Sequence, residues 1–170
     1  MFTDQQINEF KALETPFYYY DTALLQQTLD SIKKNCPPEF HVHYALKANA
    51  QPRLLEMIRN AGFGADCVSG NEVKRAVECG FQSKDIVFAG VGKTDREINY
   101  ALDQDIFCFN AESVQELKVI NTLAAGRKKT ASIALRINPN VDAHTHKYIT
   151  TGLEENKFGI NPYEFDTVLT

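Results

Sequence analysis

The chain has 170 residues, of which 44% are hydrophobic and 24% are charged, and its formal net charge is −4. This length allows one domain with its own core, and the mild negative charge argues against a nucleic-acid partner. No apolar run is long enough to cross a membrane, and the N-terminus lacks the basic and apolar stretches of a signal peptide. We therefore expect a cytoplasmic protein without a membrane partner.

The predicted elements alternate between strands and helices along most of the chain. A first strand-like segment, 15–21, falls outside the regular spacing and is expected to belong to another sheet. Five more strands are predicted at 42–47, 64–69, 85–90, 105–110 and 132–138. The segments between them carry apolar residues at helical spacing, at 52–60, 70–80, 94–103 and 111–125. Residues 157–160 are too short to be assigned as a sixth strand, and 161–170 has the pattern of a helix that begins.

This alternation favours parallel β–α–β units, which fit either a doubly wound open sheet or a (β/α) barrel. Within 132–138, three apolar side chains share one face, while the other face carries Ser132, Ala134, Arg136 and Asn138. An apolar face for helices and a small or polar face ending in a functional group suit a barrel that opens onto a site. We predict an α/β protein of the TIM-type (β/α)8 barrel class. A complete barrel has roughly 250 residues, so we expect only about five of its βα units here.

The predicted strand ends carry the residues that could do chemistry, because the carboxyl ends of parallel strands converge on one site. They are Lys47, Asp66, Asn110 and Arg136, with Gly90 and Lys93 after the third strand. A lysine among other cations can form an imine with a carbonyl compound, and a guanidinium can bind an oxyanion. The pattern leaves a second interpretation open, in which Lys47 reaches solvent and pairs with Asp66 on the rim.

Several other motifs are interpreted as structural. The segment "GVGKT" (90–94) has Val87 where a phosphate-binding P-loop needs glycine, so we reject that function. The four cysteines form no CxxC pair and are expected to be reduced. His144 and His146 lack a third ligand at a suitable spacing, so no metal site is predicted. The long irregular segment 139–156 follows the Arg136 strand, where an active-site lid belongs.

Four segments carry a family resemblance: "YALKAN" (44–49), "GFGADCVSGNEV" (62–73), "LRINPNVDAHTHKYITTG" (135–152) and "NKFGI" (156–160). In this order they resemble the diaminopimelate decarboxylases, a family within the alanine racemase-like, fold type III group of pyridoxal phosphate enzymes. "YALKAN" alone indicates only the wider group of decarboxylases. The combination of "HKYITTG" and "NKFG" indicates the diaminopimelate members.

The resemblance implies that pyridoxal phosphate is held as an imine on Lys47, with Ala45, Asp66 and Arg136 close to the cofactor. It also implies that His146, Tyr148 and Thr150 belong to a mobile loop over the substrate. The implied reaction is decarboxylation of meso-2,6-diaminopimelate to L-lysine and CO2, with an amino acid as substrate and a homodimer in the full-length protein. Related arginine, ornithine or carboxynorspermidine decarboxylases, and a pyridoxal phosphate-binding barrel without catalysis, remain alternatives.

The resemblance also implies a division of the chain. Residues 1–21 would include a strand that pairs with a C-terminal β domain, and 22–170 would form an incomplete barrel that binds the cofactor. The family's ring-stacking histidine, its acid at the pyridine nitrogen and its phosphate-binding loop have no counterpart in these residues. We therefore expect this chain to be an N-terminal piece that is inactive alone.

Overall fold

The computed structural model describes residues 2–138, 159–164 and 168 of the chain. These residues belong to two compact units, Met1–Asn35 and Cys36–Thr170. The second unit contains every strand of the described structure. Among the described residues, no helix combines the length and the apolar character that a membrane span requires.

The first unit consists of two helices, α1 (Asp4–Lys11) and α2 (Thr22–Asn35). Neither is among the predicted elements, although "TDQQ" carries a usable signal. Thr3 Oγ1 accepts a hydrogen bond from the Gln6 backbone N–H, and Gln6 Oε1 accepts one from the Thr3 backbone N–H, which is a capping box. Residues 15–21 form no strand in the described structure. Their predicted pairing with a domain outside this chain stays a prediction.

The second unit contains all five strands and all four helices predicted for residues 42–138. The strands are β1 (His43–Ala45), β2 (Gly64–Cys67), β3 (Ile86–Phe88), β4 (Cys108–Ala111) and β5 (Ile133–Leu135). The helices are α3 (Pro52–Asn60), α4 (Gly70–Glu78), α5 (Asp95–Asp103) and α6 (Val114–Gly126). Short 3₁₀ helices follow β1 (η1, Leu46–Ala48), precede β3 (η2, Ser83–Asp85) and lie at Pro162–Glu164 (η3). Most predicted strands were too long, because backbone pairing stops before the chain turns into the next loop.

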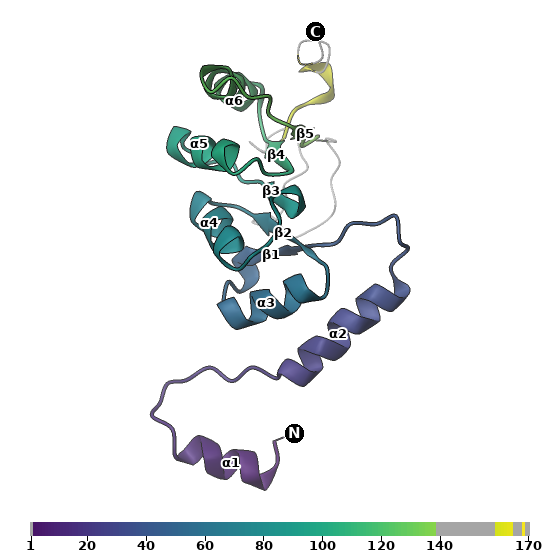
Figure 1. Ribbon diagram of the computed structural model, residues 1–170, viewed down its shortest axis with the longest axis vertical. Coiled ribbons are helices and arrows are strands. Elements are labelled where there is room, and N and C mark those ends of the chain that lie inside the picture. The colour runs from purple at the N-terminus through teal and green to yellow at the C-terminus, as the bar shows by residue number, and fades with distance from the viewer. Residues whose placement is uncertain (1, 139–158, 165–167, 169–170) are drawn as a thin grey trace. The chain divides into compact units, whose positions relative to one another are not determined.

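The strand order decides between the two predicted architectures. All neighbouring strands are parallel, and they follow one another in the order β1-β2-β3-β4-β5. Right-handed crossovers between consecutive neighbours place every helix on the same face, whereas a doubly wound sheet reverses direction and covers both faces. Figure 1 shows α4, α5 and α6 stacked along one side of the sheet. The prediction of a barrel, present here as a partial one, is confirmed.

The core lies between the helices and the face of the sheet turned toward them. Side chains on this face are almost fully buried: Ala65, Cys67, Ile86, Phe88, Phe109 and Ala111. The helices contribute buried apolar side chains from their inner faces: Leu55, Ile58, Val73, Ala76, Ile98, Ala101 and Ile120. Because side chains alternate along a strand, the residues between these positions face the barrel interior.

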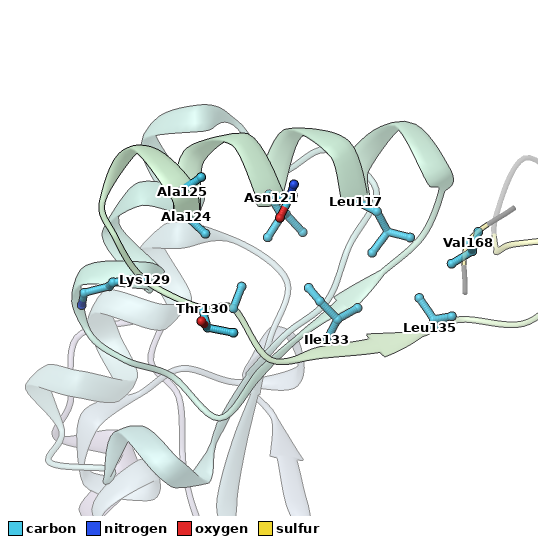
Figure 2. Close-up of a pocket in the computed structure, with 11 residues that line it drawn as sticks. Leu117, Asn121, Ala124, Ala125, Lys129, Thr130, Ile133, Leu135 and Val168 are labelled. Atoms are coloured by element: carbon cyan, nitrogen blue, oxygen red, sulfur yellow. The ribbon is translucent and has the colours of Figure 1, made fainter. Parts of the chain in front are cut away.

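A groove leaves the outer face of β5 partly open. Ile133 is 37% exposed, and a groove of about 510 Å³ separates β5 from α6. Figure 2 shows Leu117, Ile133, Leu135 and Val168 around this groove. In a singly wound sheet the helix after β5 covers this position beside α6. The groove therefore lies in the barrel's layer of helices, on the face of the sheet opposite Asp66 and Arg136.

Ile160 pairs with the chain just after β5, on the open edge of the sheet. Ile160 forms a parallel bridge with Ile137, and it is 1% exposed. The bridge is supported by two backbone hydrogen bonds, from Ile160 N–H to the Arg136 carbonyl at 2.7 Å and from Asn138 N–H to the Ile160 carbonyl at 2.9 Å. The segment 157–160, which the sequence left unassigned, thus pairs with the sheet at its last residue.

The cysteines are free, as predicted. Cys67, Cys79 and Cys108 are buried, and Cys67 and Cys108 lie in β2 and β4. Burial, together with the nearby carboxylates of Glu72 and Asp66, raises the pKa of the Cys67 thiol to about 12. This thiol is therefore protonated and unreactive at neutral pH.

Candidate active site

Lys47 lies at the carboxyl end of β1, in the turn that follows the strand. The strand ends at Ala45, and the next three residues form the 3₁₀ helix η1. This turn buries Leu46, which is 1% exposed, and leaves the Lys47 side chain exposed at the edge of the sheet. The Tyr44 hydroxyl donates to the Asn49 carbonyl at 3.1 Å and ties the end of the turn back to β1. Lys47 is thus presented by a short, anchored turn.

Asp66 lies next to this position on β2. Ala45 and Asp66 are partners in the β1–β2 register, so both side chains face the barrel interior at the same level. Asp66 Oδ1 is buried and has no hydrogen-bond partner in the described structure. Burial raises the pKa of Asp66, while the positive charges of Lys47 and His43 act in the opposite direction. A buried carboxylate oxygen without a donor is uncommon in proteins and marks a place where a bound group can supply one.

The rim salt bridge required by the second interpretation of Lys47 is not formed. Among the described residues, the ion pairs do not include one between Lys47 and Asp66. The two side chains interact at longer range, through charge alone. The lysine amine and the carboxylate are therefore both available at the same edge of the sheet.

The raised pKa of Asp66 predicts a stability that depends on pH. Folding favours the protonated carboxyl, so the free energy of unfolding falls as the pH rises from the ordinary carboxyl pKa of about 4 through the raised value. Asp66→Asn removes this loss. In the cofactor-free protein we expect the variant to have the higher thermal midpoint at pH 7, with the difference shrinking toward zero below about pH 4.

Thermal unfolding across this pH range measures the effect, with the exposed Asp30→Asn as a control for the loss of one negative charge. A midpoint for Asp66→Asn that lies below that of the wild type at neutral pH would contradict the prediction.

Arg136 follows β5, on the same face of the sheet as Asp66. Its Nη1 donates to Glu112 Oε2 at 2.9 Å, and its backbone N–H donates to the Ala111 carbonyl at 2.9 Å. Glu112 comes directly after β4 and is only 5% exposed. Its other oxygen, Oε1, accepts from the Gly90 backbone N–H at 3.3 Å. The arginine is therefore bound to a buried carboxylate that also contacts the loop after β3.

Lys93, in the segment "GVGKT", is also part of this cluster. Its side chain is 1% exposed, and Nζ donates to the carbonyls of Gly90 and Asn110 at 2.7 and 2.9 Å and to Glu116 Oε1 at 2.6 Å. Three acceptors use all three ammonium hydrogens, so Lys93 has a structural role in this structure. Phosphate binding by this segment, already rejected, would require a lysine with a donor to spare.

Sequence reasoning missed Glu112 and Glu116, and for Glu116 a signal was present. Three helices begin with the pattern S/T-x-x-E, at "SGNE" (69–72), "TDRE" (94–97) and "SVQE" (113–116). In each, the first residue caps the helix, and the glutamate side chain accepts a backbone N–H near the helix start: from Val68, Thr94 and Glu112 respectively. The pattern places a carboxylate at the site edge of each βα loop.

A cavity of about 390 Å³ opens beside Arg136. It is lined by residues from the ends of three neighbouring strands: Ala89, Asn110, Glu112, Ala134, Leu135 and Arg136. Ala134 and Arg136 face this cavity, as the predicted alternation in β5 requires. The predicted loop residues His146, Tyr148 and Thr150, and also His144, lie outside the described residues. Within the described part of the chain, no group of histidine, cysteine and acidic side chains is arranged to hold a metal ion.

A partial parallel barrel whose strand ends carry a lysine, buried carboxylates and an arginine has the architecture of an α/β-barrel enzyme with its site at the carboxyl edge. The sequence profile described as "Pyridoxal-dependent decarboxylase, pyridoxal binding domain" matches residues 22–170. The chain belongs to this family of pyridoxal-dependent decarboxylases.

Individual relatives agree with this assignment. Diaminopimelate decarboxylase from Bacteroides thetaiotaomicron is 57% identical over 165 residues, which cover 96% of this chain and 43% of the relative. The structure of diaminopimelate decarboxylase from Helicobacter pylori in complex with L-lysine matches with a TM-score of 0.87 at 43% identity. That match covers 94% of this chain and 41% of the solved chain. The arginine decarboxylase of a Paramecium bursaria Chlorella virus matches with a TM-score of 0.80 at 26% identity, over 97% of this chain and 42% of that chain. This chain spans about two fifths of the length of these relatives.

The residues at the site fit the cofactor of this family. An exposed lysine amine is able to bind an aldehyde, and a guanidinium fork is able to bind an anionic oxygen. Asp66 Oδ1 has no hydrogen-bond donor in the described structure, and a cationic or N–H group of a bound molecule would supply one. The small side chain of Ala45 lies at the same level as Asp66. The predicted cofactor residues thus lie at the carboxyl ends of β1, β2 and β5 or in the residues that directly follow β1 and β5.

Proposed function

We propose that this protein, in its full length, decarboxylates meso-2,6-diaminopimelate to L-lysine and CO2 with pyridoxal phosphate. The observation that carries the proposal is Lys47 in an anchored turn beside the half-buried Asp66, whose Oδ1 is buried and has no hydrogen-bond partner in the described structure. The substrate is suggested by relatives named diaminopimelate decarboxylase at 57% and 46% identity. L-Lysine, the product of this reaction, is the ligand in the solved Helicobacter pylori relative.

Each site residue has a role in the proposal. Lys47 would hold the cofactor covalently through Nζ, and its side chain is exposed at the edge of the sheet. Asp66 would accept a hydrogen bond at Oδ1 from a cationic or N–H group and stabilise positive charge at the lumen wall. Arg136 would bind an anionic oxygen, and the small side chain of Ala45 would leave space for the cofactor at the level of Asp66. When bound, pyridoxal phosphate accepts the electron pair that is released as CO2 leaves.

The proposed loop residues His146, Tyr148 and Thr150 would contact the substrate from segment 139–156. A homodimer and a cytoplasmic location of the full-length protein are further proposals. The homodimer follows from the family resemblance and is tested by sedimentation of the full-length protein. Cell fractionation tests the location.

Borohydride reduction of the full-length protein with pyridoxal phosphate, followed by peptide mass analysis, tests the role of Lys47. We expect the reduced cofactor on the peptide that contains Lys47. Labelling at another lysine, or no labelling, contradicts the assignment.

Release of CO2 from diaminopimelate, arginine and ornithine then tests the substrate. We expect release from diaminopimelate in the full-length protein and none from the 170-residue chain alone, since the described sheet has five of the eight strands of a complete barrel. Preference for arginine would support the alternative suggested by the viral arginine decarboxylase. Labelling without any CO2 release would indicate a barrel that binds the cofactor without catalysis.

A further inference from the structure

Glu112 is a buried charge that the proposed function does not use directly. It is 5% exposed, and burial of a carboxylate is costly unless the group is paired and hydrogen-bonded. Oε2 accepts from Arg136 Nη1 at 2.9 Å and Oε1 accepts from the Gly90 backbone N–H at 3.3 Å. The side chain thus connects the loop after β3 with the end of β5 across β4.

The backbone of Glu112 is also held in place from two sides. Its N–H donates to Glu116 Oε2 at 2.7 Å, and its carbonyl accepts from the Gly159 N–H at 3.1 Å. Both oxygens and both backbone groups of Glu112 therefore have partners, and the carboxylate has little freedom to move.

Glu116 connects this residue to a second, buried ion pair. While Oε2 accepts the Glu112 N–H, Oε1 accepts from Lys93 Nζ at 2.6 Å, with the two side chains 13% and 1% exposed. Lys93 in turn donates to the carbonyl of Gly90, whose N–H contacts Glu112. We call Gly90, Lys93, Glu112, Glu116 and Arg136 the Glu112 network. It contains two cations and two carboxylates, so the formal charges of its members sum to zero.

The network is asymmetric in its exposure. The Arg136 side chain is 41% exposed. The side chains of two other members of the network, Glu112 and Lys93, are 6% and 1% exposed. Arg136 is therefore the most exposed of the four charged members of the network. Its position is set from behind by Glu112, and the position of Glu112 is set by the Lys93–Glu116 pair.

We propose that Glu112 is a positioning residue, which holds the Arg136 guanidinium at the wall of the 390 Å³ cavity in the orientation that an anionic oxygen of the cofactor requires. This inference rests on the proposed function and adds a residue to it. Glu112 itself does not contact the reacting atoms. It acts only through Arg136.

The test uses the full-length holoenzyme and three variants, Glu112→Gln, Arg136→Gln and the double variant. Glu112→Gln keeps the shape and one acceptor but removes the charge that fixes the guanidinium. We expect kcat to fall about 10²-fold, which is the size of effect expected from a misplacement of about 1 Å at a reacting group. Because Glu112 acts through Arg136, the double variant is expected to be no slower than Arg136→Gln alone. Losses that multiply in the double variant would overturn the proposal.

A spectroscopic readout separates positioning from a merely structural role. The absorbance of the bound cofactor, titrated with pH, is expected to shift in the same direction in Glu112→Gln and in Arg136→Gln. The matched control is Glu97→Gln, in which the lost carboxylate also accepts a backbone N–H from a neighbouring βα loop, that of Gly70 at 2.7 Å, but forms none of the hydrogen bonds of the Glu112 network. This control is expected to lower the thermal midpoint but to leave the titration and kcat at wild-type values. A wild-type titration in Glu112→Gln overturns the proposal.

A second variant and a labelling experiment allow the proposal to be tested whatever the behaviour of Glu112→Gln. If Glu112→Gln does not fold, Glu112→Asp keeps the charge and shortens the reach by one methylene group. A titration that shifts in the direction of Arg136→Gln then supports the proposal, and an unshifted one overturns it. Borohydride labelling of the wild type is recorded in parallel. Absence of labelling at Lys47 indicates that the proposed function fails, whereas labelling together with an unshifted titration indicates that only the positioning role fails.

Discussion

Lys47→Ala in the full-length protein is expected to reduce CO2 release from diaminopimelate by about 10⁴-fold or more, a loss typical of removing a residue that bonds to the reacting group. The physical reason is local. Lys47 is the amine that η1 presents at the carboxyl end of β1 beside Asp66, and alanine leaves no atom there that can bond to an aldehyde. Lys47→Arg keeps the positive charge but cannot form that bond, so it is expected to be as inactive as Lys47→Ala.

The chain offers a matched control for this experiment. Lys84 is another exposed lysine in a 3₁₀ helix, η2, but it precedes β3 and therefore lies at the opposite end of the strands. Lys84→Ala is expected to keep wild-type activity. Since exposed substitutions change stability by only about 0.5 kcal/mol, all three variants should have similar thermal midpoints. Activity in Lys47→Arg close to wild type would show that the residue contributes charge and no covalent bond.

Phe88→Ala is expected to cause the largest loss of stability among single core changes, about 3–5 kcal/mol. Phe88 is fully buried at the centre of the sheet, and its ring centroid lies 6.1 Å from that of Phe109 on β4. Lys93 Nζ lies 5.4 Å from the same ring, so the substitution also removes a surface against which the buried ammonium packs. We therefore expect the Glu112 network to loosen together with the core.

Thermal unfolding of the cofactor-free protein measures this effect, at roughly 2–4 °C for each kcal/mol in a domain of this size. Phe107→Ala is the control, because Phe107 is nearby in sequence and is 54% exposed. Phe88→Leu retains most of the apolar volume and should lose less stability than Phe88→Ala. Equal midpoints for Phe88→Ala and Phe107→Ala would contradict the assignment of Phe88 to the core.

The repeating unit of the fold could be predicted from periodicity alone. Helix α3 was predicted with the bounds it has in the structure, and every other predicted helix after residue 42 is present within a few residues. These helices alternate apolar and polar residues over two or more turns, and each has a capping residue or a glycine at an end. The N-terminal helices were not predicted. The strand-forming residues of "TPFYYYD" (15–21), which lie between them, were interpreted as a strand.

The candidate site could be predicted only in part. Lys47, Asp66 and Arg136 were predicted because the carboxyl ends of parallel strands converge, a rule that needs no coordinates. Glu112 was missed because a glutamate just after a strand and before a helix is typical of an ordinary helix start. Its burial and its contact with Arg136 depend on the pairing of β4 with β5, which brings together residues 24 positions apart.

The sequence by itself determined the elements and the chemical identity of the strand ends, including the lysine of "HVHYALKANAQP". Both are local properties, set by the spacing of apolar residues and by which residue ends each strand. Only the tertiary structure decided that the strands follow one another in order and form part of a barrel, because side-chain periodicity carries no information about which strands are neighbours. Only the tertiary structure, likewise, showed that Asp66 has an oxygen without a partner and that Lys93 has no donor to spare. Hydrogen bonding and burial depend on groups from several strands at once, and these groups meet only when the sheet has formed.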